Sequence, residues 1–198
     1  MTTPHSRQGT PQVARWAVSV FCSGRTGLDD QHINLAAQLG EGLARRGYTV
    51  VTGGSRASCM GAVARAARSR GASTYGVTVR LPAFDHLADH QATLIYAEDL
   101  SDRKRNIQEI SDAFIVLAGG LGTLDELLHI WAGQAVGTHT KPLIIIDPDD
   151  LYRTLRTQIE ILHEQRLISA AALDYPSWVR TVDEAFDLLE TAQSTTDL

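Results

Sequence analysis

The stretch AFIVLAGGLGTLDE, residues 113–126, decides the fold of this 198-residue chain. Its first half is apolar almost without a break, as in a parallel strand that is covered on both faces. Its second half is rich in glycine and leads into LLHIWAGQAV, residues 127–136, which has a helical period. A glycine turn between a buried strand and a helix is typical of α/β domains that bind ligands at the edge of a parallel sheet.

The rest of the chain repeats this alternation of short apolar runs and longer helical segments. Strands are expected at residues 16–22, 48–53, 73–79, 92–97, 113–119, 142–147 and, more briefly, 177–182. Helices are expected at about 29–46, 58–71, 102–111, 122–136, 148–163 and 183–192. This order predicts a Rossmann-like, doubly wound parallel sheet of about six to seven strands in a three-layer α/β/α arrangement.

Length and composition are those of one globular domain, expected over residues 15–192, with flexible polar tails at 1–14 and 193–198. A net charge of −5 and a pI near 5.8 argue against binding of nucleic acid, which requires a basic face. No apolar run approaches the ~20 residues that span a bilayer, so no membrane association is expected. The two cysteines, Cys22 and Cys59, form neither a disulfide framework nor a metal-ligand pattern, which favours a cytoplasmic location.

The glycine turn is the strongest candidate for ligand binding. Gly119, Gly120 and Gly122 allow backbone N–H groups to approach a ligand closely, and the following helix N-terminus adds donors and partial positive charge. With the hydroxyl of Thr123, these groups predict an anion site, most naturally for phosphate. Thr123 and Glu126 also match the T-x-x-E capping box, so a helix cap and a catalytic carboxylate are equal alternatives for Glu126 on the turn alone.

A basic segment follows the strand expected at residues 92–97. Ser101 or Asp102 is expected to cap the next helix, which places Arg103 and Lys104 in its first turn. Cations there oppose the helix dipole at roughly 0.3–1 kcal/mol each, which indicates a bound anion or carboxylate. A solvated, charged turn is the alternative and explains the segment when it is considered alone.

Two further loops complete the predicted site. Gly53 and Gly54 form a second glycine turn after a strand, and the small-residue loop 21–27 follows the first strand. Because the carboxyl ends of parallel strands meet at one edge of the sheet, these loops and the basic segment predict a nucleotide-sized ligand site there.

These motifs resemble the LOG family, cytokinin-activating phosphoribohydrolases that are often mislabelled as lysine decarboxylases. The resemblance runs from about residue 18 to 167 and rests on the pattern P-G-G-x-G-T-x-x-E, preceded by M-H-x-R-K and G-G-G-x-x-G-L-M-G. The matching residues are Gly53, Gly54, Met60, Gly61, Ala62, Val63, Arg103, Lys104, Gly119, Gly120, Gly122, Thr123 and Glu126. The departures are Ala118 for the proline, Leu100-Ser101 for Met-His, and Ser55, Ser58 and Cys59 for Gly, Gly and Leu.

The resemblance implies hydrolysis of the N-glycosidic bond of a nucleoside 5′-monophosphate, AMP or an N6-modified AMP such as isopentenyl-AMP, to free base and ribose 5-phosphate. Glu126 would stabilise the positive charge that develops on the ribose and activate water, while Arg103 would stabilise the departing base or hold Glu126. The substrate-binding candidates are Gly53, Gly54, Lys104, Gly119, Gly120, Gly122 and Thr123. The resemblance also implies a homodimer, and the departures leave the accepted base open.

Two other functions stay open. One is a non-enzymatic carrier or sensor that resembles the molybdenum-cofactor carrier proteins, although these generally lack the paired R-K and T-x-x-E motifs. The other is a relative that cleaves a different nucleotide, such as CMP. A pyridoxal-phosphate decarboxylase is disfavoured because the only lysines are Lys104 and Lys141, and Lys141 directly precedes a proline at a strand start. His86, Asp89 and His90 share a loop without a fourth ligand, so neither a metal nor another cofactor is expected.

Overall fold

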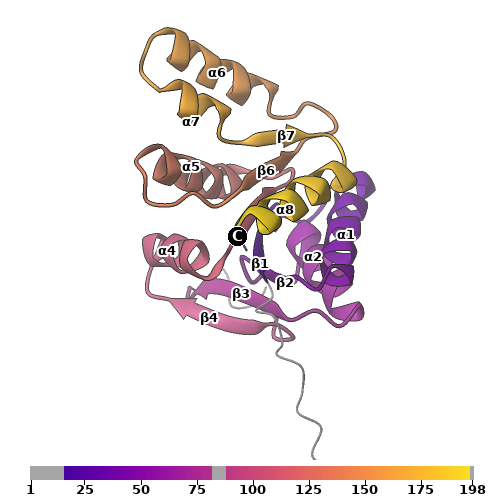
Figure 1. Ribbon diagram of the computed structural model, residues 1–198. Coiled ribbons are helices and arrows are strands. Elements are labelled where there is room, and N and C mark those ends of the chain that lie inside the picture. The colour runs from indigo at the N-terminus through magenta and orange to yellow at the C-terminus, as the bar shows by residue number, and fades with distance from the viewer. Residues whose placement is uncertain (1–15, 82–87, 197–198) are drawn as a thin grey trace, which may run out of the picture.

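The computed structural model describes residues 16–81 and 88–196 and is built around one seven-stranded sheet (Figure 1). All neighbouring strands pair in parallel, in the order β4-β3-β2-β1-β5-β6-β7. The strands are β1 (Ala17–Phe21), β2 (Thr49–Thr52), β3 (Thr74–Val79), β4 (Thr93–Ala97), β5 (Ala113–Val116), β6 (Leu143–Ile146) and β7 (Ser177–Val179). The order changes direction between β1 and β5, which is where a doubly wound sheet places its ligand. The predicted fold class is confirmed.

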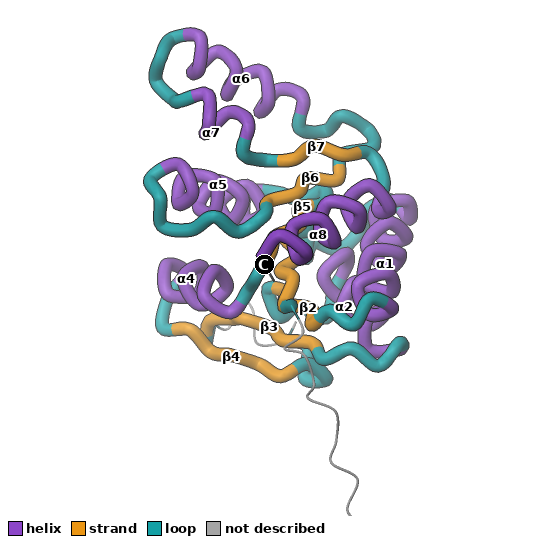
Figure 2. The backbone as a smooth tube through the Cα atoms, in the orientation of Figure 1, coloured by secondary structure: helices purple, strands orange, loops and turns teal. Residues whose placement is uncertain are grey.

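Helices cover both faces of the sheet, as Figure 2 shows. They are α1 (Asp30–Arg45), α2 (Ser58–Ser69), α4 (Leu100–Ile110), α5 (Leu121–Ala135), α6 (Arg153–Glu164), α7 (Ala170–Asp174) and α8 (Val182–Thr196). Helices α1, α2 and α8 pack on one face and share one apolar core. Helices α4 and α5 pack on the other face and share a second core. No helix in the described part of the chain is long and apolar enough to cross a membrane.

The two cores explain why the strands are apolar almost without interruption. In β5 and the residue after it, Ile115 and Leu117 point into the core beneath α1, α2 and α8. Phe114 and Val116 alternate with them and point into the core beneath α4 and α5. Because both faces of the strand are buried, both sets of alternating positions must be apolar.

Helix α6 begins at Arg153, five residues later than predicted. The cause is Asp147, whose carboxylate accepts hydrogen bonds from the backbone N–H groups of Leu151 (2.8 Å) and Tyr152 (3.0 Å). These bonds hold the intervening residues in a turn. The short helix α7 was not predicted, because five residues are too few for a helical period; the hydroxyl of Ser169 caps it by accepting from the N–H of Ala172 (3.1 Å).

Helix α8 continues past the predicted end at residue 192 and reaches Thr196. The hydroxyl groups of Ser194, Thr195 and Thr196 donate to carbonyl oxygens one turn earlier, so the polar side chains of this last turn lie along the helix backbone. Residues 193–196 of the predicted tail are therefore helical. The predicted tail at 1–14 and residues 197–198 lie outside the described residues.

Candidate active site

Helix α4 carries the basic pair and begins earlier than predicted. Its N-cap is Asp99, which has extended backbone angles and whose carboxylate accepts from the N–H of Asp102 (2.8 Å). The predicted caps, Ser101 and Asp102, are wrong because both residues already lie inside the helix. Arg103 therefore closes the first turn rather than starting it, with its N–H bonded to the carbonyl of Asp99 (2.9 Å).

The guanidinium group of Arg103 is held by two elements besides its own helix. Its Nε donates to the carbonyl oxygen of Val77 in β3 (2.7 Å), and its Nη1 donates to Oε1 of Glu126 in α5 (2.6 Å). A third element makes room for it, since a Cβ atom on Gly53 would lie closer than 3.0 Å to Nη2. The side chains of Arg103 and Glu126 are only 14% and 5% exposed, so the ion pair is shielded from water.

Glu126 does not cap helix α5. That helix starts at Leu121 with Gly120 as its N-cap, which places Thr123 inside the first turn and rules out the predicted capping box. The carboxylate of Glu126 is instead buried against Arg103. Burial raises the pKa of Glu126 above its ordinary value of 4.5, and the adjacent Arg103 opposes that shift. Of the two alternatives that the motif left open, only a role within the site fits this geometry.

A cavity of about 470 Å³ lies above the point where the strand order changes direction. Its wall comes from the loop after β1, the start of α2, the end of β3, and the starts of α4 and α5. The lining residues are Cys22, Ser23, Gly24, Arg25, Met60, Thr78, Val79, Leu100, Arg103, Gly120, Leu121, Gly122, Thr123, Asp125 and Glu126. This volume lies within the range of roughly 300–1,000 Å³ that is usual for small-molecule sites. The cavity contains the Arg103–Glu126 pair and the glycine turn together.

The glycine turn presents backbone donors to this cavity. Gly120 and Gly122 line it, and a Cβ atom on either would meet no atom within 4 Å. Gly119 has a different role, because a Cβ atom there would collide with the side chain of Thr123. No side chain among the described residues caps α5, so the N–H groups of its first turn are available to an anion. Of the residues predicted to bind phosphate, Gly120, Gly122 and Thr123 line this cavity, and Gly119 supports the turn.

The remaining predicted substrate-binding residues, Gly53, Gly54 and Lys104, do not line the cavity. Gly53 lies against Arg103, as described above. Gly54 has a φ of +80°, and its backbone lies directly against β3. The Nζ of Lys104 donates to Oδ1 of Asp125 (2.7 Å) at the edge of the cavity. Each of the three supports a residue or segment of the wall.

Four lining residues were not named individually as catalytic or substrate-binding, although loop 21–27 was predicted to contribute and Leu100 is one of the departures from the LOG pattern. Arg25 follows β1, Thr78 lies near the end of β3, and Leu100 and Leu121 begin two helices. Leu100 and Leu121 are 52% and 86% exposed, which gives the cavity an apolar rim. The signal that could have identified all four is their place at the carboxyl edge of the sheet.

Within residues 16–81 and 88–196, no group of three or more His, Cys, Asp and Glu side chains is arranged to hold a metal ion. His86, which belongs to the loop considered for metal binding, lies outside the described residues. Asp89 in the same loop instead pairs with Arg68 (2.9 Å).

The fold and the site together define an α/β protein of Rossmann type, in which a glycine turn with an uncapped helix start shares a cavity with a buried Arg–Glu pair. The chain belongs to the LOG family: residues 60–190 match the sequence family described as "Possible lysine decarboxylase". It is 40% identical to the cytokinin riboside 5′-monophosphate phosphoribohydrolase of Mycobacterium tuberculosis, over 86% of this chain and 91% of that protein. It is 34% identical to the enzyme of the same name from Rhodococcoides fascians, over 73% of this chain and 74% of that protein.

Solved structures share the fold at lower sequence identity. The molybdenum cofactor binding protein from Rippkaea orientalis has a TM-score of 0.67 and 21% identity, over 91% of this chain and 98% of that chain. A molybdenum cofactor carrier protein from Chlamydomonas reinhardtii has a TM-score of 0.68 and 17% identity, over 91% of this chain and 99% of that chain. At this identity the likeness concerns the fold alone.

Proposed function

We propose that this protein is a phosphoribohydrolase that cleaves the N-glycosidic bond of AMP or an N6-modified AMP, yielding free base and ribose 5-phosphate. The observation that carries the proposal is the buried Arg103–Glu126 pair, which shares one cavity with the open N-terminus of α5. The names of relatives with 34–40% identity support the same reaction.

Binding begins with the 5′-phosphate at the start of α5. The N–H groups of the first turn and the partial positive charge of the helix attract the phosphate. Thr123 lies within this turn and Glu126 lies one helical turn later. A nucleotide anchored by its phosphate at Gly120–Thr123 therefore places its ribose in the direction of Glu126.

The reaction breaks the bond between C1′ and the base nitrogen, and the bonding electrons leave with the base. Positive charge then develops on the ribose ring, and a nearby carboxylate stabilises it. Oε1 of Glu126 is held by Arg103, which leaves Oε2 to accept a proton from the attacking water. The water oxygen bonds to C1′, and the base departs with a proton on nitrogen.

The raised pKa of Glu126 fits this role. A carboxylate with a raised pKa is a stronger base toward the attacking water, and the proton that it takes up is then passed to the departing base. Arg103 keeps the buried carboxylate ionised enough to act, since burial alone would favour the protonated form.

The apolar rim supports an N6-substituted base. Leu100 and Leu121 are both largely exposed and both line the cavity that contains Glu126. Burial of such side chains against an alkyl group contributes about 25 cal/mol per Å² of apolar surface. An N6-isopentenyl group would therefore bind better than the bare amino group of AMP.

The test is release of ribose 5-phosphate and free base from AMP, isopentenyl-AMP and CMP. Glu126→Gln is expected to lower kcat by roughly 10²–10⁴-fold while nucleotide binding persists. Glu160→Gln makes the same change on the exposed surface of α6 and should retain full activity. Unchanged turnover in Glu126→Gln would remove Glu126 from the mechanism. Binding of a nucleotide without turnover in the wild type would favour a carrier or sensor. Turnover of CMP alone would replace AMP as the proposed substrate.

A further inference from the structure

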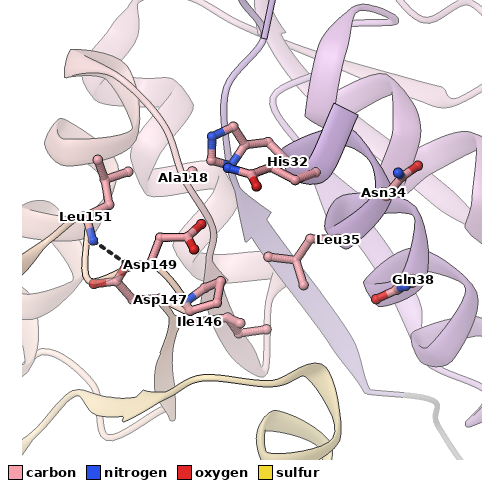
Figure 3. A pocket seen from close by; sticks show the side chains of 11 residues that line it. His32, Asn34, Leu35, Gln38, Ala118, Ile146, Asp147, Asp149 and Leu151 are labelled. Carbon is pink, nitrogen blue, oxygen red and sulfur yellow. Dashed lines mark hydrogen bonds between the residues drawn. The ribbon is translucent and has the colours of Figure 1, made fainter. Parts of the chain in front are cut away.

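A second cavity, of about 270 Å³, lies at the same edge of the sheet, and Ala118 is one of the residues that line it (Figure 3). Helix α1 forms one wall, and the end of β6 with the turn after it forms the other. The lining residues are Gln31, His32, Asn34, Leu35, Gln38, Ala118, Ile146, Asp147, Pro148, Asp149 and Leu151. None of them lines the cavity that contains Glu126, so the two cavities are separate sites.

The polar groups of this cavity differ from those of the first one. Its lining residues include no lysine or arginine, whereas Arg25 and Arg103 line the first cavity. Figure 3 shows the carboxylate of Asp149 directed toward α1, with His32 on the opposite wall. A site with a carboxylate and no cation repels phosphate and favours a ligand that presents N–H donors.

The apolar part of the wall suits a flat ring. Leu35, Ile146 and Leu151 line the cavity, and Leu151 is 55% exposed at its margin. The volume lies just below the usual range of roughly 300–1,000 Å³ for drug-sized ligands, which fits a molecule of one small ring system.

The wall formed by the turn after β6 is fixed in place. Asp147 is buried, and its two carboxylate oxygens accept from the N–H groups of Leu151 and Tyr152. The hydroxyl of Tyr152 then donates to the carbonyl of Leu117 (2.8 Å), directly before Ala118. Because neither wall has to form on binding, a ligand loses little affinity to ordering of the protein.

Ala118 connects this cavity to the first one. Its carbonyl accepts from the N–H of Ser23 (3.1 Å), and Ser23 lines the cavity of Glu126. Position 118 is also where the LOG pattern has proline, whose ring would add two carbon atoms beside the second cavity. The alanine of this chain leaves that space to a ligand, one residue before the glycine turn.

We propose that this second cavity binds a small, phosphate-free nitrogen heterocycle that carries N–H donors. Asp149 accepts a hydrogen bond from the ligand, and Leu35, Ile146 and Leu151 cover its ring. If the proposed function holds, the free base that the reaction releases belongs to this chemical class. The ligand contacts Ala118, so the base inhibits turnover without displacing the nucleotide.

The experiment titrates adenine into the full chain carrying Glu126→Gln and saturated with AMP, with calorimetry for affinity and amide NMR for location. Adenine should bind, and the shifted resonances should include His32, Leu35 and Leu151. Asp149→Asn should weaken binding about tenfold or more, as expected for loss of a hydrogen bond to a charged group. Asp183→Asn, a matched change on the exposed surface of α8, should leave the affinity unchanged.

Two outcomes would overturn the proposal. One is the absence of adenine binding at millimolar concentration. The other is binding that AMP displaces, with shifts at Leu100 and Leu121 and no effect of Asp149→Asn. Neither depends on turnover, so loss of the proposed hydrolase activity and loss of this second site are distinguishable.

Discussion

Gly53 is expected to control activity without touching the substrate. A Cβ atom at this position would lie closer than 3.0 Å to Nη2 of Arg103, whereas ordinary van der Waals contact begins at 3.4 Å. In Gly53→Ala the guanidinium group must move by roughly 0.5–1 Å, and a misplacement of about 1 Å in a catalytic group costs about 10²-fold. We therefore expect kcat to fall by about 10–100-fold, with a smaller change in KM because the phosphate turn is unaltered.

The assay is steady-state release of ribose 5-phosphate by wild type, Gly53→Ala, Arg103→Ala and the double variant. If Gly53 acts through Arg103, then Gly53→Ala costs little further activity in the Arg103→Ala background. Thermal melts control for stability, and alanine adds no backbone strain there because Gly53 is not among the glycines with positive φ. Full activity in Gly53→Ala, or additive losses in the double variant, would refute this reasoning.

Three more outcomes follow from the structure. Because burial raises the pKa of Glu126, the acidic limb of the pH–rate profile should lie above pH 4.5. In that pH range the folded state binds a proton that the unfolded state has lost, so the free energy of unfolding should fall as pH rises through it. Urea titrations at several pH values should show this fall for the wild type and not for Glu126→Gln. Asp99→Ala removes the cap of α4 and should lower the free energy of unfolding by about 1 kcal/mol, against no loss for Asp187→Ala on the exposed surface of α8. Phe114→Ala empties a fully buried site that stacks on Phe21, and should cost about 3–5 kcal/mol in the same titration; a loss below about 1 kcal/mol would contradict the packing described.

The sheet could be predicted from the sequence because burial on both faces makes each strand a continuous apolar run. All seven predicted strands are present, each within a few residues of its expected limits. Errors occurred where local hydrogen bonds decide the structure: Asp147 delays α6, and Asp99 rather than Ser101 or Asp102 starts α4.

The site was predictable only in part. The motif around Glu126 allowed both a cap and a catalytic carboxylate, since both roles require the same spacing from Thr123. The hydrogen bond that distinguishes the two roles joins Arg103 and Glu126, which are 23 positions apart in the sequence and lie on different helices. Gly53 was predicted to bind substrate, but a sequence does not reveal that Arg103 occupies the space beside its Cα. The homodimer and the cytoplasmic location stay predictions from the sequence.

The open start of α5 has a consequence for stability as well as for binding. Gly120 contributes no side chain to the first turn of α5, so the N–H groups of that turn have no side-chain partner within the part of the chain that the structure describes. On the proposed function, a phosphate-bearing ligand would complete the hydrogen bonding of that helix and act as its cap. By linkage, such a ligand at 100 times its Kd would stabilise the whole folded protein by about 2.7 kcal/mol. On the proposed function, the protein would be most stable while it is occupied, and departure of ribose 5-phosphate would loosen the turn that admits the next nucleotide.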